Sequence, residues 1–178
     1  MQQEIITDLI REKMAQGTTF RFRVISGSMV PLIGVGDEVV VRTASADRLR
    51  RGDVVLYAVD GTFHTHRLLA RRRQGKATLL VTKGDASLTP DPPWREEQLL
   101  GKVTAISREH GTLDLEGRRW KTINGLLGLL AALQVVALQA GRRVKRVIIG
   151  NRRTRWGPLL ARLVAAPSQW LVRLAELP

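Results

Sequence analysis

Residues 20–31 read FRFRVISGSMVP, an alternating stretch that ends in a tight turn. Apolar and polar side chains alternate from residue 20 onward, which is the period of a half-buried β-strand. Gly27 lets the backbone turn sharply, and Pro31 restricts the conformation at the exit of the turn. The stretch therefore predicts a strand that leads to a corner on which the hydroxyl of Ser28 can be presented.

The same period of two residues continues along the chain to residue 116. Glycine, aspartate and proline clusters at 34–37, 52–53, 60–61, 75 and 90–93 separate the alternating segments, as turns separate strands. The expected strands are 20–25, 38–42, 53–59, 62–69, 77–83, 101–107 and 112–116. Because these strands follow one another without intervening helices and without an internal repeat, the sequence predicts a mainly β protein of the α+β class.

Helical patterns flank this β-rich part. Residues 2–16 place apolar side chains at helical spacing but include five charged residues, so they predict an amphipathic helix and neither a signal peptide nor a membrane span. Residues 123–140 (INGLLGLLAALQVVALQA) barely reach the length of a span, and 159–177 form a second Leu-rich stretch. We expect a helix at 1–17, a β-rich domain at 18–117 and a basic helical tail at 118–178. The tail is either a membrane anchor or a pair of helices that cap the domain.

The charge of the chain is concentrated in that tail. The 178 residues carry a net charge of +13, with 16 basic and 12 acidic residues before position 108 and 13 basic and 4 acidic residues from there on. A basic, Leu-rich tail favours an anionic membrane surface as partner. A nucleic-acid-binding module is the weaker alternative, suggested by the arginine runs at 71–73 and 152–155, because no aromatic platform or known binding motif accompanies them.

Composition excludes several classes of protein. With no cysteine the chain has no disulfide framework, thiolate zinc site or cysteine nucleophile. An apolar content of 44% is too high for a wholly disordered chain. Nucleophilic chemistry, if present, needs a hydroxyl and a base.

Three short motifs carry groups suited to that chemistry. Ser28 lies in the first turn, His66 lies at the end of an expected strand, and Asp85 ends the next strand, with Asp91 six residues later. A hairpin could bring His66 and Asp85 to one end of the sheet, where a carboxylate can orient an imidazole. Each residue also has a plain structural interpretation, as a turn serine, a strand-surface histidine or a turn-forming aspartate. Spacing alone leaves both interpretations open.

Four motifs in this order resemble the type I signal peptidase family. They are SGSMVP at 26–31 with Gly-Asp at 36–37, GDVV at 52–55, THR at 65–67 and KGD at 83–85. The likeness spans roughly residues 20–107 and implies a signal-peptidase-like coiled β-sheet core. It is strongest to the Ser-His-Asp branch of the endoplasmic reticulum, archaea and some bacteria. The related bacterial branch and the self-cleaving repressor proteases have a lysine where this chain has His66.

The resemblance implies a role for each residue of the motifs. Ser28 corresponds to the nucleophile, His66 to the general base, and Asp85, or alternatively Asp91, to the acid that orients the base. Ser26 corresponds to a serine that supports the oxyanion together with the Ser28 N–H. The implied reaction is endopeptidase cleavage through an acyl-enzyme, without metal or cofactor. The substrate would be a signal or leader peptide lying along the strand at 20–25, with small side chains before the cleaved bond.

The chain departs from the family pattern at three places. Asp85 is followed by Ala-Ser where the family has Asn-Asn, and Val30 stands where an acidic residue is frequent. Family members ordinarily carry a membrane span ahead of the serine, which residues 2–16 do not supply. We expect a serine endopeptidase of the signal peptidase type that cleaves signal or leader peptides and is held at a membrane by residues 118–178. The departures favour a specialised relative, such as a leader-peptide protease, over a housekeeping secretory peptidase. The alternatives are a soluble cytoplasmic protease of the same superfamily and a non-catalytic scaffold, which the presence of all three catalytic-type residues disfavours.

Overall fold

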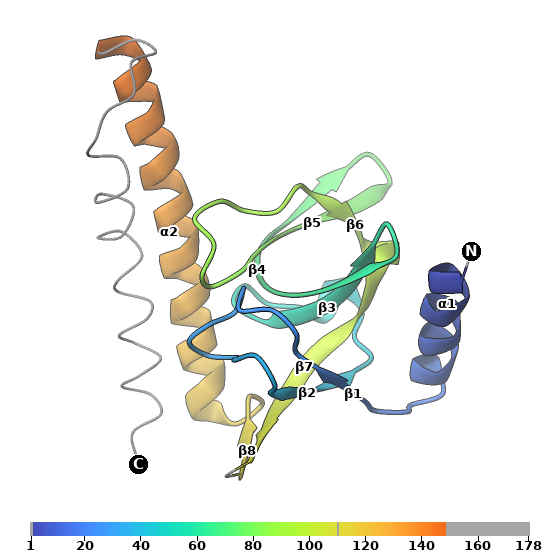
Figure 1. Ribbon diagram of the computed structural model, residues 1–178. Helices are drawn as coiled ribbons and strands as arrows, with labels where there is room; N and C mark the ends of the chain where they lie inside the picture. The colour runs from blue at the N-terminus through green and yellow to red at the C-terminus, as the bar shows by residue number, and fades with distance from the viewer. Residues whose placement is uncertain (1, 110, 149–178) are drawn as a thin grey trace.

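One antiparallel sheet forms the body of the molecule in a computed structural model that describes residues 2–109 and 111–148 (Figure 1). Helix α1 (Gln2–Ala15) precedes the sheet and the long helix α2 (Arg118–Ile148) follows it. The eight strands are β1 (Phe20–Arg23), β2 (Glu38–Arg42), β3 (Val54–Val59), β4 (Thr62–Gln74), β5 (Ala77–Lys83), β6 (Trp94–Arg95), β7 (Leu99–Arg108) and β8 (Gly111–Asp114). The architecture is mainly β with one long C-terminal helix, in agreement with the expected α+β class.

The sheet curls so that strands far apart in its order come into contact. The order is β1-β2-β7-β3-β4-β5-β6, with β8 paired to β7, and every pairing is antiparallel. Three strands separate β1 from β4, yet the rings of Phe22 and Phe63 lie 6.1 Å apart. This ring contact brings β1 close to the start of β4, and within the described residues β1 pairs only with β2, so its other edge is unpaired. The curl creates a trough between these two strands.

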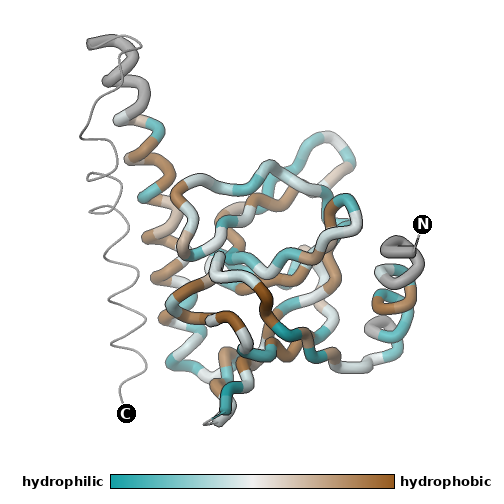
Figure 2. Tube along the Cα trace, in the orientation of Figure 1, coloured by the Kyte–Doolittle hydropathy of each residue, from teal (hydrophilic) through white to brown (hydrophobic). Residues whose placement is uncertain are grey.

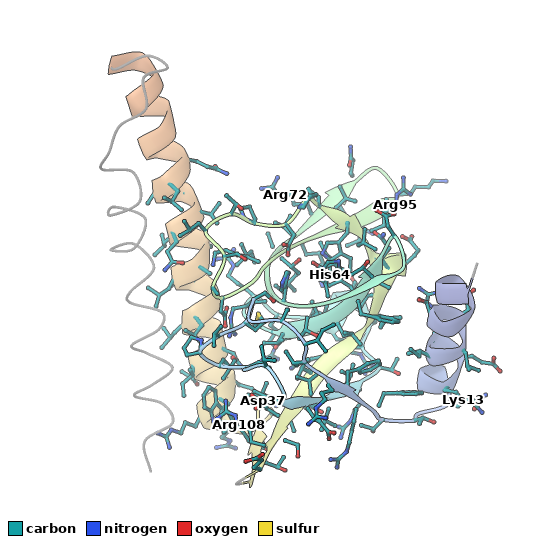
Figure 3. The ribbon with its side chains drawn as sticks, viewed as in Figure 1. Lys13, Asp37, His64, Arg72, Arg95 and Arg108 are labelled. Carbon is teal, nitrogen blue, oxygen red and sulfur yellow. The ribbon has the colours of Figure 1, made fainter. Side chains whose placement is uncertain are left out.

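The turn between β1 and β2 is tied to the rest of the sheet. The Val24 N–H donates to the Asp37 carbonyl, and the Gly36 N–H donates to the Val24 carbonyl, both at 2.8 Å. The Asp37 carboxylate accepts a hydrogen bond from Arg108 of β7 at 3.3 Å, and the two side chains lie at the same end of the sheet in Figure 3. These contacts hold both ends of the segment that carries residues 26–31.

Helix α2 packs on the body with one face only. Its buried side chains recur every three or four residues: Trp120, Asn124, Leu127 and Ala131. The opposite face exposes Leu126, Leu129, Leu133 and Val136. Figure 2 shows hydrophobic residues recurring along the helix, and segment Arg118–Gly141 is long and apolar enough to cross a membrane by length and composition. One side of α2 thus belongs to the protein core, whereas the other is apolar and uncovered by the described part of the chain.

Glycines bring α2 against the turn before β3. Gly52 adopts φ +94°, and a Cβ added there would lie 1.9 Å from the Asn124 carbonyl oxygen. A Cβ added at Gly128 would lie 2.6 Å from the Gly52 Cα. The helix and the turn therefore approach backbone to backbone, a distance that only glycine permits.

The structure differs from the sequence prediction at the β4–β5 hairpin and at β6. The expected strand at 62–69 continues to Gln74, so the arginines at 71–73, which the sequence left outside any strand, pair with residues 78–80 of β5, and the turn lies at Gly75 as its glycine signal predicted. The two-residue strand β6 was not expected, because the prolines just before it favour a turn. The predicted Leu-rich stretch at 159–177 lies outside the described residues.

Candidate active site

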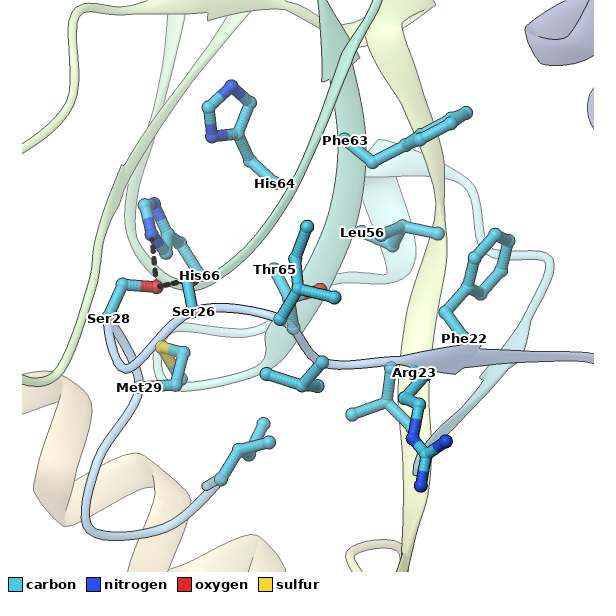
Figure 4. A pocket seen from close by; sticks show the side chains of 14 residues that line it. Phe22, Arg23, Ser26, Ser28, Met29, Leu56, Phe63, His64, Thr65 and His66 are labelled. Atoms are coloured by element: carbon cyan, nitrogen blue, oxygen red, sulfur yellow. Dashed lines mark hydrogen bonds between the residues drawn. The ribbon is translucent and has the colours of Figure 1, made fainter. Parts of the chain in front are cut away.

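The corner after β1 places the Ser28 hydroxyl at the edge of a cavity of about 190 Å³ (Figure 4). The Val30 N–H donates to the Gly27 carbonyl at 3.3 Å, and the Ile33 N–H donates to the Met29 carbonyl at 3.0 Å, which closes two successive turns. The side chain of Met29 points into the core and is 1% exposed. Ser28 is therefore held on a turn that is anchored from below.

His66 meets Ser28 from the opposite side of the trough. Its Nε2 lies 3.1 Å from the Ser28 Oγ, as the dashed line in Figure 4 marks. Strand β4 pairs with β3 from its first residue, with His66 opposite Val55, and its pairing with β5 begins at the next residue, Arg67, so the imidazole projects from the point where β4 becomes paired on both sides. This is the geometry that a general base needs to take a proton from a nucleophilic hydroxyl.

Asp91 holds the other nitrogen of the imidazole. Its Oδ2 lies 2.7 Å from His66 Nδ1, and the same oxygen accepts hydrogen bonds from the hydroxyls of Thr82 at 2.7 Å and Tyr57 at 3.1 Å. The Trp94 indole N–H donates to the Thr82 hydroxyl at 3.0 Å, and the Trp94 ring stacks on Tyr57 with centroids 4.1 Å apart. With the carboxylate at Nδ1 we assign the proton there, which leaves Nε2 free to accept from Ser28.

The surroundings of Asp91 favour its ionised form. Burial raises the pKa of its carboxyl group, but the hydrogen bonds from His66, Thr82 and Tyr57, with the charge of His66, outweigh burial and lower the pKa below its usual value. The same partly buried pocket raises the pKa of Tyr57, chiefly through burial, so its phenol remains a hydrogen-bond donor to Asp91. Asp91 is thus a charged acceptor at neutral pH.

Asp85, which the sequence named first as the acid beside His66, pairs with a different side chain in the structure. Its carboxylate pairs with Arg67 through two hydrogen bonds, from Nε at 2.8 Å and from Nη2 at 2.6 Å. Neighbouring residues of a strand point to opposite faces, so Arg67 and His66 leave β4 on different sides, and each meets a different acid. Spacing along the chain placed both acids near the end of β5 but carried no information about which side each one reaches.

Ser26 and Gly84 lie on either side of Ser28. The Ser26 Oγ lies 3.4 Å from the Ser28 Oγ. On the other side, the Ala86 N–H donates to the Ser28 carbonyl at 2.9 Å, and a Cβ at Gly84 would lie 2.7 Å from that carbonyl oxygen and 3.2 Å from His66 Nε2. The loop after β5 therefore packs directly on both members of the Ser28–His66 pair.

Several residues of the site were not predicted from the sequence. Tyr57, Thr82 and Trp94 surround Asp91, and of these only Thr82 stands beside a recognised motif, KGD at 83–85. His64 lines the cavity and stacks on Tyr57, with ring centroids 5.2 Å apart. Burial lowers its pKa, and the charge of His66 lowers it further, against the opposing effect of Asp91. Within the described ranges no group of three or more histidine or acidic side chains could hold a metal ion.

A hydroxyl, an imidazole and a carboxylate in hydrogen-bonded series are the arrangement that serine hydrolases use. Here they stand on a mainly β scaffold at the rim of a small cavity.

Comparison with known proteins leads to the same class. Over 86 residues the chain is 33% identical to Signal peptidase I W of Bacillus subtilis (strain 168), a match that covers 47% of this chain and 45% of that protein. The chain thus spans less than half the length of this curated relative. No protein-family model matches the chain. The similarity supports a serine peptidase of the signal peptidase I kind. The four sequence motifs resemble the same family.

Proposed function

We propose that the protein is a serine endopeptidase related to signal peptidase I, with Ser28 as nucleophile, His66 as general base and Asp91 as the acid that orients the base. The observation that carries the proposal is the unbroken series from Ser28 Oγ to His66 at 3.1 Å and from His66 to Asp91 at 2.7 Å. Asp85 has a structural role in this proposal, because its carboxylate is taken up by Arg67.

The reaction follows from these positions. Ser28 Oγ attacks a peptide carbonyl while His66 Nε2 removes its proton, and Asp91 stabilises the imidazolium that forms. The proton passes to the leaving amine, and a water molecule activated by His66 then hydrolyses the acyl-enzyme. The Ser28 N–H and the Ser26 hydroxyl, 3.4 Å from Ser28 Oγ, stabilise the oxyanion.

The trough beside the site accommodates an extended chain. The cavity is lined by the stretch from β1 to the Ser28 turn and by the first residues of β4, so a substrate segment can pair with the outer edge of β1. A volume of about 190 Å³ admits small side chains before the cleaved bond. We assign the substrates as signal or leader peptides of precursor proteins on this basis and on the similarity to signal peptidase I.

Helix α2 and the basic tail hold the enzyme at an anionic membrane surface in this proposal. The uncovered apolar face of α2 and the positive charge of residues 118–178 support it. Extraction of membranes with alkaline carbonate tests this attachment, and retention of the protein in the membrane fraction would support it. The alternative is a soluble leader-peptide protease of the same superfamily. Recovery of the full chain only in the soluble fraction, before any extraction, would favour the alternative.

Cleavage by purified variants tests the catalytic assignment. The full-length wild type and the variants Ser28→Ala and His66→Ala are incubated with peptides that carry Ala, Gly or Ser before the candidate bond, and products are identified by mass spectrometry. Both variants should lose cleavage, whereas Ser45→Ala, a serine substitution outside the cavity, should retain it. Full activity of Ser28→Ala would refute the mechanism.

A further inference from the structure

A fully buried arginine connects helix α2 to the active site. Arg67 is 0% exposed, and its guanidinium makes four hydrogen bonds, two of them to Asp85. The other two leave from Nη1, to the Gly52 carbonyl at 2.7 Å and to the Asn124 side-chain oxygen of α2 at 2.8 Å. Asn124 is itself 5% exposed. A polar group buried on the packed face of a helix is costly unless it has a partner, and Arg67 is that partner.

The Asp85 end of this network reaches the nucleophile. Asp85 lies between Gly84 and Ala86, and both of these residues contact Ser28: the Ala86 N–H donates to the Ser28 carbonyl at 2.9 Å, and Gly84 packs against that carbonyl closely enough to exclude a Cβ. The Asp85 carboxylate, held by Arg67, therefore lies one residue from each of the two positions that contact the Ser28 turn.

The Asn124 end is fixed as firmly. A Cβ at Gly52 would meet the Asn124 carbonyl at 1.9 Å, and one at Gly128 would meet the Gly52 backbone at 2.6 Å. Backbone contacts this close leave α2 little freedom to slide or rotate on the turn. Asn124 thus presents its side-chain oxygen to Arg67 from an immobile support.

We propose that Asn124 is a positioning residue of the active site, which acts through Arg67, Asp85 and the loop at 84–86 to hold Ser28 in line with His66. Helix α2 is then part of the catalytic framework as well as a covering element. The proposal rests on the proposed serine peptidase function for its catalytic consequence, whereas the structural coupling from α2 to Ser28 is independent of it.

The test compares Asn124→Leu with Leu127→Ala in the full chain. Leu127 is buried on the same face of α2 but belongs to the apolar core, so its truncation loosens the packing and leaves Arg67 its partners. Two quantities are measured: kcat and KM for peptide cleavage, and the hydrogen-exchange rate of the Ala86 amide relative to that of the Val24 amide, whose partner is Asp37. Asn124→Asp, which retains an oxygen acceptor for Arg67, serves as the conservative variant.

The proposal predicts a selective effect. Asn124→Leu should lower kcat about tenfold with KM unchanged and should speed Ala86 exchange about tenfold against Val24. Asn124→Asp should retain the wild-type kcat and the wild-type exchange rate of the Ala86 amide. Leu127→Ala should lower the melting temperature without changing kcat or the Ala86 exchange rate relative to Val24. Equal effects of Asn124→Leu and Leu127→Ala, or no effect of Asn124→Leu, would overturn the proposal. If wild type cleaves no peptide, the proposed function fails, and the exchange of Ala86 decides the coupling by itself.

Discussion

The two acids of the site should respond differently to removal of their charge. Asp91→Asn and Asp85→Asn are matched substitutions, since each replaces one carboxylate oxygen by an NH₂ group and leaves the size of the side chain unchanged. In the structure the Asp91 carboxylate contacts the imidazole of His66. The Asp85 carboxylate contacts the guanidinium of Arg67 and does not contact His66. The first variant should therefore act on catalysis and the second mainly on stability.

The contacts set the expected magnitudes. The amide of an Asp91→Asn variant can accept the hydrogen bond from His66 Nδ1–H, but it has no negative charge to stabilise the imidazolium. Alternatively, its NH₂ group donates to Nδ1 and imposes the wrong tautomer on the ring. In either case we expect kcat to fall by about 10³- to 10⁴-fold. Asp85→Asn leaves the buried charge of Arg67 without its counterion, which costs about 3–5 kcal/mol. For a chain of this size that corresponds to a fall in Tm of roughly 6–20 °C. Its kcat should fall only about tenfold, through the displaced loop.

The assay measures kcat on a peptide substrate and Tm by circular dichroism on the same preparations, at a temperature where each variant is folded. Ser28→Ala gives the background rate. A larger loss of kcat in Asp85→Asn than in Asp91→Asn, at equal folded fractions, would show that the hydrogen bond from His66 Nδ1–H to Asp91 does not orient the base.

Three further changes test the packing, the titration and the membrane face. Gly52→Ala should destabilise the fold by at least about 1–3 kcal/mol in urea denaturation, because φ +94° is strained for alanine and the added Cβ would overlap the backbone of α2. Gly75→Ala should cost less, because at φ +62° its Cβ would face open space. The pKa of Asp91 is lower in the folded protein than its value of 3.8 in the unfolded chain. Ionisation of Asp91 therefore stabilises the fold fully at pH values above 3.8, and this stabilisation is lost as the pH falls through the folded pKa. The difference in Tm between wild type and Asp91→Asn should accordingly shrink on acidification, and a constant difference would contradict the assignment. Leu129→Glu with Leu133→Glu should weaken binding to anionic vesicles in sedimentation while Tm stays within a few degrees, since both side chains are exposed; unchanged binding would remove α2 from the membrane contact.

The sheet could be predicted from local patterns because its strands are separated by strong turn signals. Segments 38–42 and 77–83 alternate and end at glycine or charged residues, and the structure places β2 and β5 within the same bounds. The extension of β4 over the arginines at 71–73 could not be predicted in this way. Those side chains are charged and exposed, so no hydrophobic period marks them, and only pairing with β5 makes them a strand.

The site was predictable up to the point where opposite faces of the sheet must be distinguished. Ser28 and His66 were singled out by their place in the ordered motifs that resemble the signal peptidase family, although His66 lies within β4 and not at the end of a strand, where the sequence placed it. The exchange of Asp85 and Asp91 depends on which side of β4 each acid approaches, and that is fixed by the path of the loop through residues 84–91. Asn124 is 57 positions from its partner Arg67, so no local period connects them.

The position of Asn124 also gives the composition of α2 a physical meaning. The length and mean hydropathy of Arg118–Gly141 suffice for a membrane span even though the segment includes three side-chain amides and several glycines. The structure separates the two faces: Asn124 and Gly128 lie where the helix meets Arg67 and Gly52, and the leucines at 126, 129 and 133 lie on the uncovered side. Two of the residues that weaken α2 as a span, Asn124 and Gly128, thus join it to the protein. In the proposed enzyme, a membrane surface that covers the leucines would lie across the helix from the network that supports Ser28, so lipid contact and catalysis would share one helix without competing for the same side chains.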